Sequence, residues 1–459
     1  MKIFKRVFLT LLGSAVVFGL WYMYQNALPI IAGYGAKSIC SCVMVAGRDP
    51  QNVIDNEVGK FPFSLGWYSV DYSDSSATGT VMGLAKQKAI YRKGLGCTLI
   101  AEITEEELRA QYIKLPSHPT IDQDTIPWPS GDLTTDSLPK GVDYETLRKV
   151  VHDAFDEGTE SKLRRTRAIV IAYDGKIIAE TYAQGFNSKS KQIGWSMTKS
   201  ITNAMVGILV KEGKLDVTKS APIASWANDN RNTITLNDLM QQSSGLLWNE
   251  NYSTPSSVTN MLFRKKNMGL YAAESPLQGI PGEKFYYSSG TSNIISRVVR
   301  STAGDENYYK LPYEKLFYKI GMYSALLEPD AGGTFVGSSY CFATARDWVR
   351  FGLLYLNDGV WNDERILPVG WVTYTTTPAR GAPIGEYGAQ FWLNAGEKGN
   401  PAERRYPDAP VDLFIADGFE GQNVWVVPSK KLVIARLSLQ QGNYLNANRF
   451  LADVISTLP

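Results

Sequence analysis

The sequence predicts an α/β fold of the α+β kind, with an antiparallel sheet, flanking helices and a helical subdomain. Two observations predict it. β-type runs occur early in residues 141–459, in RAIVIAYDGKIIAETYAQG, and late, in QNVWVVPSKKLVIARLSL, while the chain between them has mainly helical character. Distant segments are therefore expected to complete one sheet. A small β-rich N-terminal module is expected to precede this domain.

The N-terminus has the pattern of an export signal or a signal anchor. Three basic residues precede an uncharged stretch, VFLTLLGSAVVFGLWYMY at residues 7–24, and no charge follows until Lys37. A basic flank followed by roughly 18–20 apolar residues is typical of a membrane-entering segment. A buried core helix and cleavage after Gly35 are the alternatives. We favour a retained anchor within residues 1–36, which predicts an exported, periplasmic or other extracytoplasmic protein.

Residues 37–115 are expected to form the accessory module, with β-type runs in CVMVAG, TVMGLA and KQKAIY. Four cysteines fit an exported protein with at most one or two disulfides. Cys97 with Cys40 or Cys42 is the candidate bridge, because all three lie in this module, and we select Cys40–Cys97. Three reduced, buried thiols are the alternative. The following residues, 116–140, are rich in proline and turn formers and predict a surface linker.

Within residues 141–459 the elements follow in order. DYETLRKVVHDAFDE places Leu147, Val151 and Phe155 on one helical face. Asp174-Gly175 joins two β-runs and predicts a tight hairpin, since glycine takes the positive φ that such turns need. The late β-runs form a second hairpin, and NRFLADVISTL predicts a closing helix.

Composition excludes several classes of function. The chain has 47 basic and 45 acidic residues and no long basic run, so nucleic acid is not an expected partner. His118 and His152 are the only histidines, and Cys40-x-Cys42 lacks the usual zinc spacing. We therefore expect neither a metal nor an organic cofactor. Neither histidine is near a candidate serine, so a Ser-His-Asp triad is not expected.

A serine enzyme on this chain needs another base, and burial can lower the pKa of a lysine enough for that role. Ser196-Met197-Thr198-Lys199 opens a long apolar helical run, which places Lys199 one turn from Ser196 near free backbone N–H groups. The same S-x-x-K pattern at Ser137–Lys140 and Ser188–Lys191 opens no such helix. Taken alone, the motif favours an ordinary interpretation, in which Ser196 caps the helix and Lys199 is a solvated helical lysine.

The surrounding motifs resemble the penicillin-binding and serine β-lactamase superfamily, especially its class C-like branch of esterases and amide hydrolases. SMTK resembles the first motif, and Tyr287-Ser288-Ser289 in PGEKFYYSSGTSNIISRVV resembles the second. LNDLMQQSSGLLW and GKLDVTKSAPIASW resemble segments between them. The resemblance covers roughly residues 141–459. It implies a β-lactamase/transpeptidase-like fold, Tyr287 as a base or acid beside Lys199, and Ser289 in a proton relay; a packing role is the alternative for Tyr287.

The third motif departs from the family pattern of Lys-Thr-Gly or His-x-Gly. Its best match, Asp417 to Gln422, holds neither lysine nor histidine, so the usual clamp for a substrate carboxylate is missing. Substrate contacts are expected from Ser289, Gly421, Gln422 and Trp195, with an oxyanion donor on the strand after Gly421. A plain β-turn is the alternative. Trp248 and Trp425 also flank the motifs, either in the cleft or in the core.

These patterns predict a serine hydrolase that cleaves a small ester or linear amide through an acyl-enzyme, similar to the 6-aminohexanoate-dimer hydrolase and esterase members of the family. A penicillin-recognising D-aminopeptidase or β-lactamase is the second hypothesis. A non-catalytic, membrane-anchored binding protein with the same fold is the third. The expected partners are a small-molecule substrate and, through the N-terminal segment, the membrane.

Overall fold

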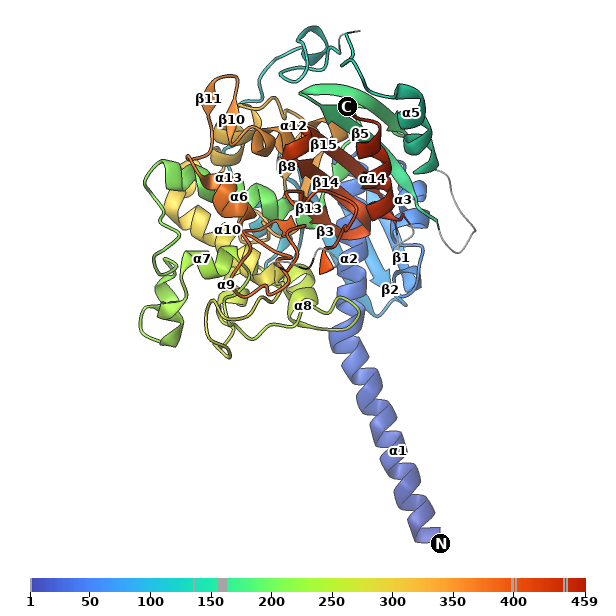
Figure 1. Cartoon of the computed structure of the whole chain (residues 1–459). Coiled ribbons are helices and arrows are strands. Elements are labelled where there is room, and N and C mark those ends of the chain that lie inside the picture. The colour runs from blue at the N-terminus through green and yellow to red at the C-terminus, as the bar shows by residue number, and fades with distance from the viewer. Residues whose placement is uncertain are drawn as a thin grey trace. The chain divides into compact units, whose positions relative to one another are not determined.

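The computed structural model describes residues 2–134, 137–155, 163–397, 400, 403–440, 442 and 445–459 (Figure 1). The chain divides into two compact units. We call the first the N-terminal unit; it consists of Met1–Gln111, Asn249–Met268 and Pro329–Gly333. We call the second the sheet unit; it consists of Tyr112–Trp248, Gly269–Glu328 and Thr334–Pro459.

The N-terminal unit is a long helix packed on a four-stranded antiparallel sheet. Helix α1 continues through two π-helical segments and α2 without a break, as Figure 1 shows. The sheet follows chain order, β1-β2-β3-β4. The bounds are α1 (Lys2–Tyr22), η1 (Met23–Ala27), α2 (Leu28–Cys40), η2 (Ser41–Val45), α3 (Pro50–Glu57), β1 (Gly66–Asp71), β2 (Ser76–Val81), β3 (Ala85–Arg92), β4 (Gly96–Leu99), α4 (Glu105–Ala110) and α8 (Ser257–Arg264).

The predicted strand in CVMVAG is wrong, because Ser41–Val45 continues the helix. A short apolar run cannot be assigned to strand or buried helix from periodicity alone. Helix α2 also crosses the boundary that the sequence placed between residues 36 and 37. The far end of α2 is tied to the sheet by a disulfide between Cys40 and Cys97.

The helical stretch Phe4–Val45 is long and apolar enough to cross a membrane, by length and composition. The described side chains from Phe4 to Gln25 are exposed, whereas α2 buries most of its residues. Together with the disulfide, the long apolar helix indicates an exported protein.

The sheet unit is built on a six-stranded antiparallel sheet in the order β12-β13-β14-β15-β5-β6. β5 and β15 are neighbours although they lie far apart in the sequence, with Ile171 opposite Ile434. This confirms that distant segments complete one sheet. The bounds are β5 (Thr166–Tyr173), β6 (Lys176–Tyr182), β12 (Trp392–Leu393), β13 (Phe414–Gly418), β14 (Gln422–Val427) and β15 (Leu432–Ser438).

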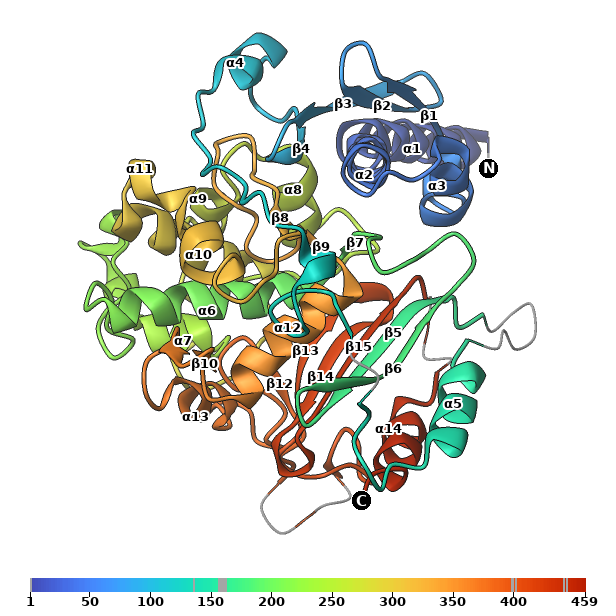
Figure 2. The ribbon, with the colours of Figure 1, turned by 90° about the horizontal axis from the view of Figure 1, so that it is seen from above.

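Helices cover both faces of this sheet (Figure 2). On one face α5 and α14 form a core with Trp425 and Ile434, so Trp425 is a packing residue. On the other face α12 lies so close that a Cβ at Gly352 would approach Val433 within 2.5 Å. The helices of the unit are α5 (Tyr144–Asp153), α6 (Thr198–Lys211), α7 (Leu236–Met240), α9 (Met268–Ala273), α10 (Ser289–Ala303), α11 (Asp305–Tyr308), α12 (Ala345–Leu356), α13 (Trp371–Thr376) and α14 (Ala447–Ser456).

Short strands complete the sheet unit. A three-stranded sheet has the order β7-β9-β8, and a two-stranded sheet pairs β10 with β11. Their bounds are β7 (Gln192–Ile193), β8 (Leu326–Leu327), β9 (Cys341–Ala343), β10 (Val360–Trp361) and β11 (Glu364–Arg365). The predicted Asp174-Gly175 hairpin joins β5 to β6, and Gly175 has a φ of +77°. The predicted fold class is therefore confirmed.

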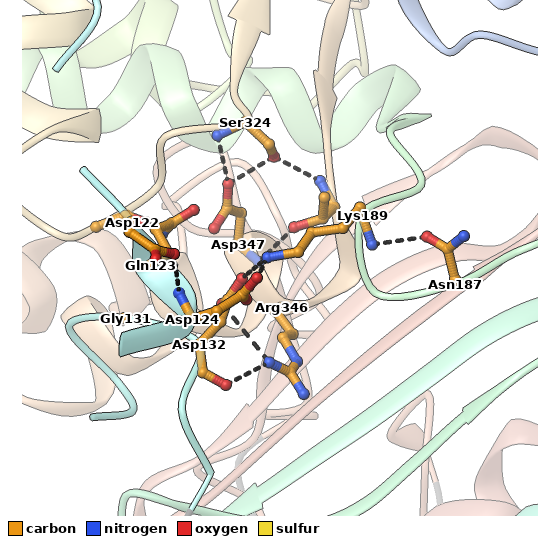
Figure 3. Close-up of polar contacts among 12 residues, drawn as sticks. Asp122, Gln123, Asp124, Gly131, Asp132, Asn187, Lys189, Ser324, Arg346 and Asp347 are labelled. Carbon is orange, nitrogen blue, oxygen red and sulfur yellow. Dashed lines mark hydrogen bonds and ion pairs between the residues drawn. The ribbon is translucent and has the colours of Figure 1, made fainter. Parts of the chain in front are cut away.

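The proline-rich segment that the sequence assigned to a linker is partly buried on α12. Arg350 donates to the carbonyl oxygens of Pro129 and Gly131 and to the Asp132 carboxylate, at 2.6–2.7 Å. Lys189 donates to the other Asp132 oxygen at 2.8 Å, as Figure 3 shows. Burial works to raise the pKa of Asp132, but the bonds from Lys189 and Arg350 hold it below its ordinary value.

Candidate active site

Ser196 lies in a 3-10 turn, η5 (Trp195–Met197), immediately before α6. Trp195 has a φ of +46°, a left-handed conformation that is costly for a bulky residue. The turn is fixed from β9, since Gly194 N donates to Cys341 O at 2.8 Å and Cys341 N donates to the Thr198 hydroxyl at 3.0 Å. These hydrogen bonds hold the strained turn in place and position Ser196 at the N-terminal end of α6.

Lys199 is 2% exposed and is the second residue of α6, one turn after Ser196. Its Nζ donates to Ser196 Oγ at 3.0 Å, to Ser289 Oγ at 3.1 Å and to the Ser338 carbonyl oxygen at 3.1 Å. These three bonds orient the amine toward the Ser196 hydroxyl. The structure thus brings together Ser196, Lys199 and Ser289, residues that the sequence selected.

Tyr287 lies beside Lys199. The amine nitrogen is 4.7 Å from the centre of the Tyr287 ring, and the same ring stacks on Trp392, with the ring centres 5.3 Å apart. Tyr287 is half-buried and packs against a small cluster that includes Tyr387. These aromatic contacts fix the position of the ring beside Lys199.

Residues missed by the sequence analysis hold this arrangement. Gln242 accepts from Ser288 N at 3.0 Å and donates to Ser292 at 2.9 Å, which fixes the start of α10. Ser338 supplies the carbonyl acceptor for Lys199, and its hydroxyl accepts from Asn293 at 3.0 Å. Gln242 lies within the LNDLMQQSSGLLW segment and could have been found there. Ser338 has no such local signal, because it is 139 residues from Lys199.

The Asp417–Gln422 segment forms the β13–β14 hairpin, and its first half lies against the Ser196 turn. A Cβ on Gly418 would come within 2.1 Å of the Gly194 carbonyl oxygen, so only glycine allows this approach. The Phe419 ring packs edge-on against Trp195 at 6.0 Å. The backbone at Gly418–Phe419 therefore borders Ser196 closely.

The second half of the hairpin turns toward β15. Gln422 is 2% exposed and its side chain accepts from the backbone N–H of Ser438 and donates to the Ser438 carbonyl. Gly421, with a φ of +79°, accepts from Arg436 and Ser438 through its carbonyl. The contacts of Gly421 and Gln422 therefore stabilise the pairing of β14 with β15. Trp195, in contrast, is adjacent to Ser196 and contacts Phe419 beside it.

A cation stands near the third motif although the motif itself has none. Arg405 donates to Asp417 at 2.9 Å and lies over the Trp392 ring, 5.5 Å from its centre. Burial opposes the charge on Arg405, but the neighbouring Asp417 carboxylate raises its pKa above the ordinary value. A cavity of about 640 Å³ adjoins this pair and Phe419.

The two histidines lie elsewhere. His118 bonds the Tyr323 carbonyl, and His152 belongs to α5. Among the residues that the structure describes, no group of three His, Cys, Asp or Glu side chains is placed to hold a metal ion. Trp248 is buried against α10, where a Cβ on Gly290 would approach its ring within 2.7 Å.

Comparison with known proteins agrees with this fold. The profile of the Beta-lactamase family matches residues 151–454. The 6-aminohexanoate-dimer hydrolase of Paenarthrobacter ureafaciens is 26% identical over 328 residues, which cover 63% of this chain and 79% of that protein. A solved Bacillus anthracis structure, proposed to be a 6-aminohexanoate-dimer hydrolase, is 22% identical with a TM-score of 0.56 and covers 72% of this chain and 89% of its own.

A family VIII carboxylesterase structure is 15% identical with a TM-score of 0.52, over 68% of this chain and 96% of that one. These likenesses define a β-lactamase/transpeptidase-like fold with an additional N-terminal sheet region. Because the profile spans more than half of the chain, the protein belongs to the β-lactamase family of serine hydrolases.

Proposed function

We propose that the protein hydrolyses a small ester or linear amide through an acyl-enzyme formed on Ser196. The observation that carries the proposal is the 3.0 Å hydrogen bond between Lys199 Nζ and Ser196 Oγ at the start of a buried helix. A nucleophile in direct contact with its base is the geometry that acyl transfer requires. The reaction proposed for Ser196 and Lys199 needs neither a metal nor an organic cofactor.

In acylation, Lys199 in its neutral form, or Tyr287 as a phenolate beside the Lys199 ammonium, takes the proton of Ser196. The serine oxygen then bonds to the substrate carbonyl carbon, whose oxygen becomes an oxyanion. When the intermediate collapses, the bond to the leaving alcohol or amine breaks. Tyr287 gives a proton to that leaving group and, where Lys199 was the base, regains one from Lys199. Ser289, whose hydroxyl accepts from Lys199 Nζ at 3.1 Å, is proposed to extend this relay to the leaving group.

Two backbone N–H groups are proposed to hold the oxyanion. One is that of Ser196, at the N-terminal end of α6, where the helix dipole adds to its effect. The second follows Gly418 instead of Gly421, because Gly418 abuts Gly194 and Phe419 packs on Trp195. Water then attacks the acyl-enzyme by the reverse proton path and releases the acid.

The substrate class follows from the third motif. Asp417 occupies a position where the family usually presents a cation, and its charge is paired with Arg405. This pairing leaves less positive field for a substrate carboxylate than a free lysine would give. It supports esters and linear amides over β-lactams and D-alanyl peptides, as does the likeness to the 6-aminohexanoate-dimer hydrolase.

Covalent labelling tests the proposal. The full chain is treated with a fluorophosphonate, and the labelled peptide is mapped by mass spectrometry, with Ser196→Ala as the control. We expect one label on Ser196 and none in the variant, with the free energy of unfolding changed by no more than about 1 kcal/mol at this half-exposed position. An unlabelled wild type would support the non-catalytic binding protein, and a label on another residue would refute the Ser196 assignment.

Relative acylation rates separate the two enzymatic hypotheses. A p-nitrophenyl ester and a fluorescent penicillin are offered to the same preparation. Faster turnover of the ester supports the proposed substrate class. Faster and stable acylation by the penicillin would favour the D-aminopeptidase or β-lactamase alternative.

We also propose that α1 anchors the protein in a membrane and leaves both units in the periplasm or another extracytoplasmic space. The basic residues at positions 2, 5 and 6 precede the apolar stretch, as expected for the end that stays in the cytoplasm. A disulfide in the N-terminal unit requires an oxidising compartment on the other side.

A further inference from the structure

Large apolar side chains gather at one end of the N-terminal sheet. Leu65 directly precedes β1 and Met82 directly follows β2, and these positions adjoin because Gly66 pairs with Val81. Leu84 completes the β2–β3 turn. We call this group the foot patch; its members and their exposed fractions are Phe61 80%, Leu65 40%, Trp67 67%, Met82 62% and Leu84 56%.

The foot patch lies at the end of the unit from which α1 departs. Leu28 and Ile31, in the first turns of α2, pack with Val81 and Ala85, the residues that flank the exposed β2–β3 turn. Phe63, between Phe61 and Leu65, packs against the same cluster. Figure 1 shows α1 leaving the unit from this end of α2. The span and the foot patch are therefore fixed relative to each other within one unit.

Helix geometry places the foot patch near the bilayer surface. Trp21, Tyr22 and Tyr24 are exposed at the end of the apolar stretch, where aromatic rings mark a membrane interface. From Tyr24 to Leu28 an α-helix rises about 6 Å, and each headgroup layer is roughly 5–8 Å thick. Side chains level with Leu28 that point toward the membrane therefore reach the headgroup layer.

The charges around the foot patch suit an anionic surface. Lys60 and Lys86 are exposed and flank the patch, and the loop segments 60–65 and 82–86 contain no acidic residue. Arg264 of α8 donates to Asn26, at the junction between α1 and α2. Basic residues beside exposed apolar side chains are typical of surfaces that rest on phospholipid headgroups.

We propose that the N-terminal unit is a membrane-resting platform, whose foot patch inserts into the headgroup layer of an anionic bilayer beside the α1 anchor. The proposal depends on the anchor and is independent of the chemistry proposed for Ser196. The proposed role of the N-terminal unit is therefore to hold itself against the membrane surface, so that α1 is not its only attachment to the bilayer.

Depth-dependent quenching tests the platform. Met82→Cys and Tyr72→Cys are made in the full chain and labelled with an environment-sensitive fluorophore. The protein is then placed one copy per nanodisc in phosphatidylglycerol-containing lipid. Tyr72 is the matched control, since it is 65% exposed but lies at the opposite end of the same sheet, just after β1. Cys42 and Cys341 are buried, and the parent chain labelled in parallel gives their background.

We expect lipids with a nitroxide near the headgroup to cause a marked loss of emission from the label at position 82 and none from the label at 72. Equal emission at position 82 with and without the nitroxide would overturn the proposal. So would equal quenching of both labels.

Discussion

Among single residues, Lys199 is the one whose surroundings most constrain the chemistry. Its amine is almost fully buried and bonds to two hydroxyl oxygens and a carbonyl oxygen, and a tyrosine ring covers another side. The bonds to Ser196, Ser289 and Ser338 hold the amine against the Ser196 hydroxyl, which is the position that a base for this serine must occupy.

Replacement of Lys199 tests this interpretation. Lys199→Ala should lower kcat/KM for a p-nitrophenyl ester by about 10³-fold or more, because nucleophile and base act as a unit. Lys211→Ala, at the exposed end of the same helix, serves as the matched control and should keep nearly full activity. Comparable activity in the two variants would show that Lys199 is not the base.

Tyr287 offers a second test with a neighbouring control. Tyr287→Phe removes only the hydroxyl and should lower kcat by about 10²–10⁴-fold, the usual loss for a general acid or base. Tyr286→Phe changes an adjacent ring that is 46% exposed, and it should leave kcat unchanged. If Tyr287→Phe retained wild-type kcat across the pH range, a packing role against Trp392 would be sufficient to explain this residue.

Among the elements, the proline-rich segment and α12 form a charged clamp. The carboxylate of Asp132 accepts from Arg350 at one oxygen and from Lys189 at the other. Its backbone carbonyl accepts from Arg346, and Figure 3 shows the contacts of Lys189 and Arg346. The folded-state pKa of Asp132 lies below its ordinary value. Its contribution to stability is therefore complete at neutral pH and is lost as the pH falls below about 4 and through the lowered pKa.

Asp132→Asn should lower the free energy of unfolding at pH 7 by about 1–3 kcal/mol and weaken the dependence of stability on pH in the acid range. Denaturant-induced unfolding of the full chain, followed at pH 7 and at pH 3, measures both the loss of free energy and its dependence on pH. Asp124→Asn is the control, because Asp124 binds the same Lys189 from an exposed position and should cost less than about 1 kcal/mol. Equal losses in both variants would show that burial of Asp132 adds nothing.

Helix α2 gives a physical reason for retention of the N-terminal segment. Cleavage after Gly35 would remove Leu28, Ile31 and Ala32, which form a buried cluster with the start of β3. It would also separate the first half of α2 from the half that carries Cys40. An element that supplies the core of a folded unit is a poor substrate for removal, which supports the anchor over a cleaved peptide.

At the scale of the whole molecule, the disulfide links the end of α2 to β4 across a separation of 57 residues. Cys40→Ser should destabilise the N-terminal unit by about 4 kcal/mol, from the loop entropy that the bridge removes in the unfolded chain. Thermal unfolding with and without reductant measures this effect. In the Cys42→Ser variant, the unfolding temperature should still fall when reductant is added, because the Cys40–Cys97 bridge is intact. An unfolding temperature that no longer responds to reductant would indicate that Cys42 takes part in the bridge.

How much of the site could be predicted depends on how local each signal is. Ser196 and Lys199 share one helical turn, so their spacing determines that they meet. Tyr287 and Ser289 were predicted as site residues because a motif surrounds them. We propose the second oxyanion donor after Gly418, a few residues before the position that the sequence predicted, because Gly421 contacts Arg436 and Ser438 and these contacts follow no short sequence pattern.

The sequence by itself determined the family, the serine–lysine pair, the β5–β6 hairpin and the apolar N-terminal helix, because each depends on residues close together in the chain or on a motif. The tertiary structure alone decided the carbonyl of Ser338 beside Lys199, the pairing of Arg405 with Asp417, the clamp on Asp132 and the position of the foot patch beside α1. These features join segments that only the packed sheets and helices bring together, and such contacts leave no periodic trace in the sequence.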